Sequence, residues 1–245
     1  MYITSTDNQK VKLYRKLNNK KYRDKYNLFI IEGFHNIYEA YDCNMLEELI
    51  LLENINTNFE VPKLNVSKKV MDYIYKMPST PKMLGICKIL NKEELGNKII
   101  MLDNVQDPGN LGTIIRSAAA FNFDTVVLSE DCVDVYNPKV LRACEGMVFN
   151  VNIVKTDLIP CIKKLLKEDY EVYATSVIRG ENIANIDSSN KIACIMGNEG
   201  NGIRPEIFKL NLKKIFINMG KKCESLNVGV AGSILMYEVF NAANR

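Results

Sequence analysis

Apolar runs rich in Ile and Val recur through the second half of the chain. They lie at 98–105, 124–130, 149–155, 170–177, 191–197 and 214–219, and helical patterns separate most of them, at 110–122, 137–147, 157–168, 205–210 and 227–241. The runs lack the polar alternation of a half-exposed strand, which is typical of strands buried on both faces. Strands that alternate with helices predict parallel pairing with right-handed crossovers, and therefore an α/β domain.

The first 95 residues carry a more mixed pattern of short helices and strands. A basic helical stretch at about 8–25 precedes the apolar run LFIIEG, and a helical pattern at 34–42 precedes a strand-like run at 48–53. Residues 63–77 predict a short strand and then a helix that Ser67 would cap. The polar segment 91–97 is typical of a linker. We therefore expect two domains, 1–95 and 96–245, the first a small α/β domain.

Charge is distributed unevenly along the chain. Residues 1–26 hold eight Lys and Arg against two Asp, although the formal net charge of all 245 residues is only +3. A basic stretch indicates an anionic polymer partner, because Lys and Arg displace counterions from a phosphate backbone. A solvated lysine-rich helix explains the same charges equally well. The candidate RNA-binding residues are Lys10, Lys12, Arg15, Lys20, Lys21 and Arg23.

Several function classes are excluded or disfavoured by missing residues. The seven cysteines form no CxxC pair and His35 is the single histidine, so we expect no metal site. Scattered, reduced cysteines are typical of a cytoplasmic protein, and the longest apolar run, 228–237, is too short to span a bilayer. A P-loop signature is absent, and GNEGNG reverses the glycine spacing of the dinucleotide fingerprint. A serine hydrolase would need a histidine close to its nucleophile, and it is disfavoured because His35 lies in the first predicted domain.

Three loops that follow predicted strands carry unusual residues, and ligands of open α/β sheets bind beyond the carboxyl ends of strands. The first segment, 102–121, reads LDNVQDPGNLGTIIRSAAAF. Asn110 is placed to cap a helix that begins near Leu111. Thr113, Arg116 and Ser117 would then share one face of that helix, while Ile114, Ile115 and Ala118 point toward a core.

The second and third loops are GNEGNGI at 197–203 and NMGKKCESLNVGVAGS at 218–233. Glu199 lies between two glycines directly after a buried strand, and glycine lets a ligand approach the backbone closely. Ser225 or Asn227 would cap the last helix. Each feature alone is explained by a turn, a cap or a solvated side chain, whereas their ordered combination on three strand ends favours a ligand site.

Together these segments resemble the three motifs of the SpoU-type, TrmH-like RNA ribose 2′-O-methyltransferases of the SPOUT superfamily. The resemblance covers about 98–241 and respects the order and spacing of the motifs. It implies an α/β, parallel-sheet catalytic domain with a deep trefoil knot, S-adenosylmethionine as cofactor, and a homodimer whose active sites both chains complete. The N-terminal part is similar to the substrate-binding domain of many members, which folds like a small ribosomal RNA-binding protein. Gly229 departs from the serine of many members.

The resemblance also implies roles for single residues. The catalytic positions carry over to Asn110, Arg116, Glu199, Ser225 and Asn227, and the cofactor-binding positions to Gly197, Ile217, Leu226, Thr175, Gly200 and Met219. A proton-accepting role for Arg116 is chemically awkward, because a guanidinium stays protonated. A bidentate grip on the phosphate beside the target ribose suits it better, and its part in proton transfer stays open.

We therefore expect S-adenosylmethionine-dependent methyl transfer to a ribose 2′-hydroxyl of RNA, and ribosomal RNA rather than tRNA. One alternative is a non-catalytic RNA-binding or ribosome-assembly factor on the same fold, which the intact motif residues argue against. Others are a tRNA-directed or a base-directed SPOUT methyltransferase. Alkali resistance of the modified linkage separates ribose methylation from base methylation.

Overall fold

The computed structural model of the chain describes residues 2–76, 78–89, 94–177, 180–186, 191–210 and 212–243. The chain divides into two compact units, one of Met1–Leu90 with Tyr136–Asn150 and one of Asn91–Val135 with Val151–Arg245. Residues 136–150 thus pack with the N-terminal unit, although the pattern placed them within the second domain. Residues 91–93 of the expected linker lie outside the described residues.

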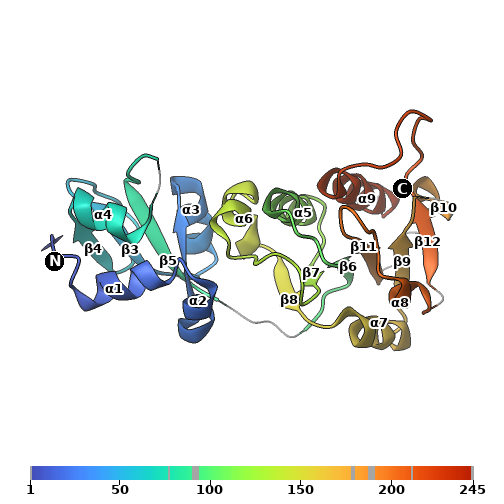
Figure 1. Cartoon of the computed structure of the whole chain (residues 1–245), viewed down its shortest axis with the longest axis horizontal. Coiled ribbons are helices and arrows are strands. Elements are labelled where there is room, and N and C mark those ends of the chain that lie inside the picture. The colour runs from blue at the N-terminus through green and yellow to red at the C-terminus, as the bar shows by residue number, and fades with distance from the viewer. Residues whose placement is uncertain are drawn as a thin grey trace. The chain divides into compact units, whose positions relative to one another are not determined.

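The C-terminal unit is built on a parallel sheet, as the apolar runs predict. Its seven strands in the described residues run in the order β10-β12-β9-β11-β6-β7-β8, and every pair is parallel (Figure 1). The strands are β6 (Lys98–Leu102), β7 (Thr125–Leu128), β8 (Asn152–Lys155), β9 (Glu171–Thr175), β10 (Glu181–Asn182), β11 (Ile192–Met196) and β12 (Lys213–Phe216). Only β10, two residues long, gave no sequence signal.

Helices cover both faces of this sheet, so its central strands are buried. They are α5 (Pro108–Ala120), α7 (Leu158–Lys167), α8 (Pro205–Phe208) and α9 (Val228–Ala242), with a short 3₁₀ turn, η2, at Ile183–Asn185. Figure 1 shows α7 and α8 along one face and α5 and α9 along the other. Ile162 and Ile207 pack into the core of the first face, whereas Ile114 is buried beneath α9 on the second.

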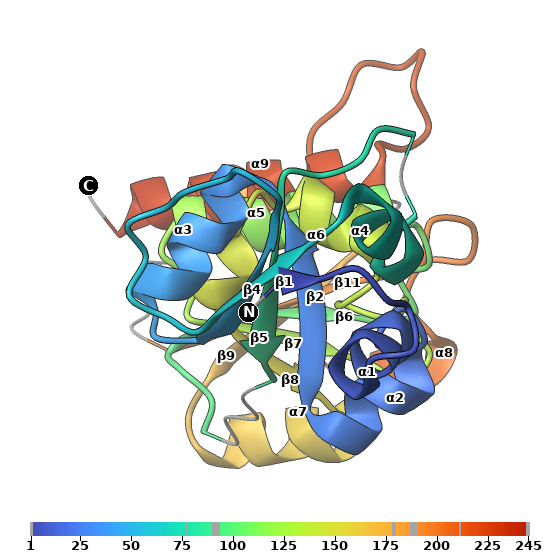
Figure 2. The ribbon, with the colours of Figure 1, turned by 90° about the vertical axis from the view of Figure 1, so that its left-hand side faces the viewer.

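The N-terminal unit has a five-stranded sheet in the order β1-β4-β3-β5-β2, in which β5 alone runs antiparallel to its neighbours. Figure 2 shows α1 and α4 on one side of the sheet and α3 on the other. The strands are β1 (Tyr2–Ile3), β2 (Leu28–Glu32), β3 (Leu46–Leu52), β4 (Lys63–Val66) and β5 (Met83–Lys88). The helices are α1 (Gln9–Lys16), α2 (Lys20–Tyr26), α3 (Phe34–Asp42), α4 (Lys68–Ile74), α6 (Pro138–Ala143) and the 3₁₀ turn η1 (Met147–Phe149).

One local prediction for the N-terminal unit is wrong, and a second is correct for the position of the residue only. The basic stretch forms two helices rather than one, because the Asn19 side chain caps α2 by accepting the Lys21 N–H at 3.0 Å. Asparagine competes with the backbone in this way and therefore ends or starts helices more readily than it continues them. Ser67 occupies the position before α4, but its hydroxyl makes no capping hydrogen bond to a described residue.

Candidate functional site

The loop after β6 enters α5 through Asp107, and the prediction that Asn110 caps this helix is wrong. The Asp107 carboxylate accepts the Asn110 N–H at 2.9 Å, and Pro108 takes the first helical position. Proline suits that position because the N–H it lacks would have no partner within the helix. Asn110 therefore lies within the first turn, and its side chain is available to the neighbouring loops.

The Asn110 amide joins the three predicted motifs. Its Nδ2 donates to Oε1 of Glu199 at 3.0 Å, and its Oδ1 accepts from Nδ2 of Asn227 at 2.8 Å. The Asn110 residue is only 9% exposed, so these two hydrogen bonds satisfy a nearly buried amide. Asn227 also accepts the N–H groups of Gly229 and Val230, which confirms it as the cap of α9. We call Glu199, Asn110 and Asn227 the motif junction.

The Glu199 carboxylate is held by several donors from the first motif. Besides Asn110, the backbone N–H groups of Gln106 and Asp107 donate to it at 3.3 and 3.2 Å. Partial burial acts to raise the pKa of this carboxyl, but the hydrogen bonds from Asn110 and the backbone outweigh it and lower the pKa. Glu199 is therefore an ionised clamp between two loops and a weak proton acceptor.

Gly197 is required by a close backbone approach. A Cβ atom added there would lie 2.1 Å from the carbonyl carbon of Gly202 and 2.3 Å from the nitrogen of Ile203. The turn is closed by paired hydrogen bonds between Asn198 and Gly202, and Gly202 has a φ of +67°. A side chain at residue 197 would therefore push the Glu199 loop away from α5.

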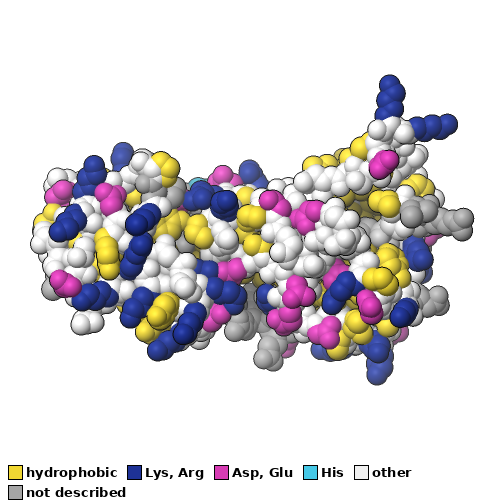
Figure 3. Space-filling model, viewed as in Figure 1, with side chains coloured by type: hydrophobic (Ala, Val, Ile, Leu, Met, Phe, Trp, Pro, Cys, Tyr) yellow, Lys and Arg dark blue, Asp and Glu magenta, His cyan; other side chains and the backbone are white. Residues whose placement is uncertain are grey.

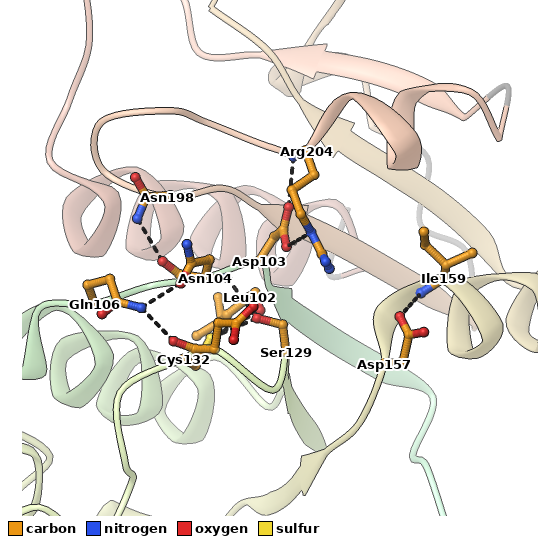
Figure 4. Close-up of polar contacts among 11 residues, drawn as sticks. Leu102, Asp103, Asn104, Gln106, Ser129, Cys132, Asp157, Ile159, Asn198 and Arg204 are labelled. Atoms are coloured by element: carbon orange, nitrogen blue, oxygen red, sulfur yellow. Dashed lines mark hydrogen bonds and ion pairs between the residues drawn. The ribbon is translucent and has the colours of Figure 1, made fainter.

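A second tie between the loops was missed by the sequence analysis. Asp103 is fully buried, and its carboxylate accepts from the Arg204 N–H at 2.8 Å and from Arg204 Nε at 2.7 Å (Figure 4). Nearby, Asn198 Nδ2 donates to the carbonyl of Asn104 at 2.8 Å, and the Asn104 N–H donates to Ser129 Oγ at 2.9 Å. The only signal for these residues was polar side chains directly after a buried strand.

Arg116 lies on the exposed face of α5 beside Thr113, as predicted, while Ile114 and Ile115 are buried. Its guanidinium makes no hydrogen bond or ion pair with another residue of the described ranges. Gly229 lets the start of α9 approach this helix, because a Cβ there would lie 3.3 Å from the Thr113 Cβ. The arginine is therefore exposed to solvent, and it follows Asn110 on the same helix.

The other predicted catalytic and cofactor-binding residues lie in or beside these loops. Ser225 is exposed, and its side chain takes no part in the motif junction. Thr175 ends β9, Gly197 follows β11 and Ile217 follows β12, and these strands are joined in one parallel run. The half-buried side chains in this set are Thr175, Ile217, Met219 and Leu226, whereas Gly200 is exposed. Apolar side chains and glycine backbone fit a nucleoside cofactor that lacks phosphate.

The basic N-terminal residues do not all face solvent. Arg23 is 5% exposed, and its Nη1 donates to the Leu17 carbonyl at 2.8 Å, so the prediction that it contacts RNA is corrected. Three lysines have acidic partners, in the pairs Lys10–Glu48, Lys12–Asp7 and Lys20–Asp24. Arg15 lies over the ring of Tyr73, and Lys21 is exposed.

Comparison with known protein families identifies the family of this chain. Residues 97–237, more than half of the chain, match the SpoU rRNA Methylase family. The chain belongs to the SpoU rRNA methylase family. Residues 8–85 match the MRM3-like substrate binding domain. The family and the enzyme class predicted from the three motifs, an RNA methyltransferase, are thereby confirmed.

Named relatives and solved structures agree with this family over nearly the whole chain. The 23S rRNA (guanosine(2553)-2′-O)-methyltransferase RlmP of Bacillus subtilis is 34% identical over 97% of this chain and 98% of its own length. An AdoMet-bound rRNA methyltransferase from Sinorhizobium meliloti is 27% identical, with a TM-score of 0.86 over 98% of this chain and 97% of the other. The SpoU methyltransferase AviRb from Streptomyces viridochromogenes, 17% identical with a TM-score of 0.84 over 96% and 97% of the two chains, shares the fold.

The part of the chain that the structure describes contains neither a membrane-spanning helix nor a metal-binding cluster. Across the described ranges no helix has the length and apolar character needed to cross a membrane. No group of three or more His, Cys, Asp or Glu side chains in the same ranges is arranged to hold a metal ion.

Gly197→Ala should destabilise the protein by about 1–3 kcal/mol, because the new methyl group must displace the backbone at Gly202. Urea unfolding measures the change. Gly220→Ala is the matched control, since a Cβ there meets nothing within 4 Å. Equal stabilities of the two variants would contradict the close approach at Gly197.

Glu199→Gln should lower the melting temperature at neutral pH. The folded pKa of Glu199 is depressed, so its stabilising contribution is complete above the ordinary value of 4.5 and is lost as the pH falls through the folded pKa. The difference from wild type should therefore shrink on acidification below about pH 4.5. Exposed Glu130→Gln is the control and should show a small difference at every pH. If the difference in melting temperature between Glu199→Gln and wild type is the same at neutral pH and below about pH 4.5, the depressed pKa of Glu199 is contradicted.

Proposed function

We propose that this protein transfers a methyl group from S-adenosylmethionine to the ribose 2′-hydroxyl of a guanosine in 23S rRNA, the position that the name of the RlmP relative specifies. The observation that carries the proposal is the motif junction. Its hydrogen bonds of 3.0 and 2.8 Å fasten all three family motifs together, and α5, which supplies Asn110, also carries the exposed Arg116. A site held in this way supplies the positioning on which an in-line displacement depends.

The cofactor site comprises the carboxyl ends of neighbouring strands and the third loop. S-adenosylmethionine supplies an activated methyl group, so the transfer needs no metal and no covalent enzyme intermediate. The Gly197 loop offers backbone groups, and Ile217 and Leu226 offer half-buried apolar surface. The Thr175 hydroxyl donates to the Ile195 carbonyl at 2.9 Å, so it supports the strand end. Met219 and Gly200 belong to the same proposed binding set.

Arg116 is proposed to bind RNA at the reacting nucleotide. Its guanidinium is permanently charged, and it has no hydrogen-bond or ion-pair partner among the described residues. It can therefore grip the phosphate beside the target ribose with two N–H groups and stabilise negative charge that develops on the 2′-oxygen. Exposed Ser225 would contact the same nucleotide. Asn110, Glu199 and Asn227 act as positioning residues, because their polar groups are already engaged with one another.

We also infer that the protein is a homodimer through the catalytic unit. Val230 and Tyr237 of α9 are 47% and 48% exposed, and the ring of Tyr237 packs edge-on against Phe121 at the end of α5. A second copy that covers this apolar surface would approach the face that carries Arg116. Light scattering during gel filtration should give twice the chain mass of 27.9 kDa, and a monomer at micromolar concentration would refute the inference.

The remaining features of the proposal rest on the family. They are a trefoil knot in the C-terminal unit, a cytoplasmic location, an RNA-binding role for residues 1–95 and a catalytic role for residues 96–245.

Arg116→Ala should reduce methyl transfer to unmodified 23S rRNA by roughly 10²–10³-fold, as loss of one oxyanion-stabilising group does in other enzymes. Because the side chain is exposed, cofactor affinity and melting temperature should change little. Arg116→Lys should recover only part of the rate, since lysine keeps the charge and loses the fork. The assay follows labelled methyl groups into separate 23S rRNA and tRNA pools.

The position of the label decides between the candidate reactions. Alkali-resistant label in 23S rRNA, entering with wild type only, supports the proposal. Label in tRNA would show that tRNA is the substrate instead. Label at an alkali-sensitive linkage would show that a base, and not the ribose, is methylated. Cofactor binding without label in any pool would favour a non-catalytic RNA-binding factor.

A further inference from the structure

The basic residues of α1 and α2 fall into two groups with different partners. Lys10, Lys12 and Lys20 lie within 2.9 Å of a carboxylate oxygen. The other group faces tyrosine, in the pairs Arg15–Tyr73, Lys16–Tyr22 and Lys25–Tyr26, each with its cation 5.5 Å from the ring centroid. Each cation of the first group has a carboxylate partner, whereas those of the second lie beside an aromatic face and have no carboxylate partner among the described residues.

The tyrosines of the second group lie on packed elements and reach solvent. The rings of Tyr22 and Tyr26 are nearly parallel, at an interplanar angle of 13° and a centroid separation of 6.5 Å. Tyr26 and Tyr73 are 37% and 38% exposed. The Asn18 side chain, between α1 and α2, donates to the Ile74 carbonyl at the end of α4 at 2.7 Å, which holds these helices together.

We call Arg15, Lys16, Tyr22, Lys25, Tyr26 and Tyr73 the tyrosine surface. Figure 3 shows Lys and Arg side chains interspersed with side chains of its hydrophobic class, which includes Tyr, over α1 and α2. Lys21 on α2 adds an exposed cation. The arrangement combines flat aromatic faces with positive charges that have no acidic partner in the described residues.

A second exposed aromatic patch in the same unit has the opposite charge. Phe34 and Tyr38 of α3 are 63% and 49% exposed. The charged residues of that helix are Glu39 and Asp42, and it contains no Lys or Arg. Its acidic surroundings would repel a phosphate backbone, so exposed aromatic rings alone do not favour RNA binding. The tyrosine surface differs because its exposed rings lie beside cations that have no acidic partner among the described residues.

We propose that the tyrosine surface binds an unpaired segment of the RNA substrate, with bases stacked on tyrosine rings and Arg15, Lys16, Lys21 and Lys25 near the phosphates. The proposal deepens the function proposed above and rests on it, since it assumes that RNA is the substrate. Every base has a stackable face, and an aromatic side chain gains stacking energy only when that face is open. A continuous duplex hides the faces and offers phosphates alone.

The experiment measures RNA binding by the full chain with fluorescence anisotropy. The probes are a fluorescein-labelled, unstructured 16-nucleotide RNA and a hairpin duplex of similar charge. Tyr22→Leu/Tyr26→Leu should weaken binding of the unpaired probe by about tenfold or more, whereas Tyr22→Phe/Tyr26→Phe should stay within about twofold of wild type. Affinity for the duplex should be nearly the same for both variants. Tyr73→Ala, on a different helix, tests the surface independently if the leucine variant unfolds.

The salt dependence of binding tests the charged part of the surface. Each lysine that neutralises a phosphate contributes about 0.7 to the slope of log affinity against log salt for a single strand. Lys21→Gln and Lys25→Gln should each reduce the slope by about that amount. Lys163→Gln on α7, an exposed lysine of the other unit, is the matched control and should leave the slope unchanged.

The outcomes separate this inference from the proposed function. Unchanged binding of the unpaired probe by the leucine and Tyr73→Ala variants, with normal methylation of 23S rRNA, would overturn the tyrosine surface alone. Equal losses for the two probes would also overturn it, because the surface would then contribute equally to unpaired and paired RNA. Tyrosine-dependent binding of unpaired RNA by a chain that binds cofactor yet methylates no RNA would support the surface and contradict the proposed reaction.

Discussion

The Asn110 amide is the interaction on which the candidate site depends. The residue is 9% exposed, and its side chain donates to Glu199 and accepts from Asn227, which lie 89 and 117 residues further along the chain. An unsatisfied buried amide is costly, so loss of either partner would penalise the others. The three loops therefore form a single unit, in which none can move without breaking a hydrogen bond of its neighbours.

The parallel sheet makes this junction possible. Parallel strands end at a common edge, so loops that are distant in the sequence meet there. Asp103, at the end of β6, adds the tie to Arg204, and the glycines of the second loop allow its backbone to fold tightly enough for Glu199 to reach α5. The Glu199 carboxylate accepts hydrogen bonds from Asn110 and from two backbone N–H groups, whereas the Arg116 guanidinium makes no hydrogen bond or ion pair with another described residue.

The two units present different chemistry to RNA. In the proposed reaction, the C-terminal unit would use the exposed Arg116 and the motif junction to position a single nucleotide. The N-terminal unit offers several cations, of which some are neutralised by carboxylates and others face tyrosine rings. In the proposed RNA complex, phosphate contacts would supply affinity and orientation, whereas stacking would distinguish unpaired from paired RNA. Specificity for one nucleotide would thus require both units.

The sequence by itself determined the longer strands and the main helices of the C-terminal unit, and it identified the three motifs. Buried parallel strands lack polar alternation, and the 3.6-residue period of α5 already separated Arg116 from Ile114 and Ile115. It named the wrong cap for α5, because Asp107 and Asn110 are both good caps and only the observed start of the helix distinguishes them. It gave no sign that Arg23 is buried, because a basic helix pattern does not show which face packs. The tertiary structure alone decided the Glu199–Asn110–Asn227 contacts, the Asp103–Arg204 pair and the packing of residues 136–150, since each joins segments whose proximity no local pattern encodes.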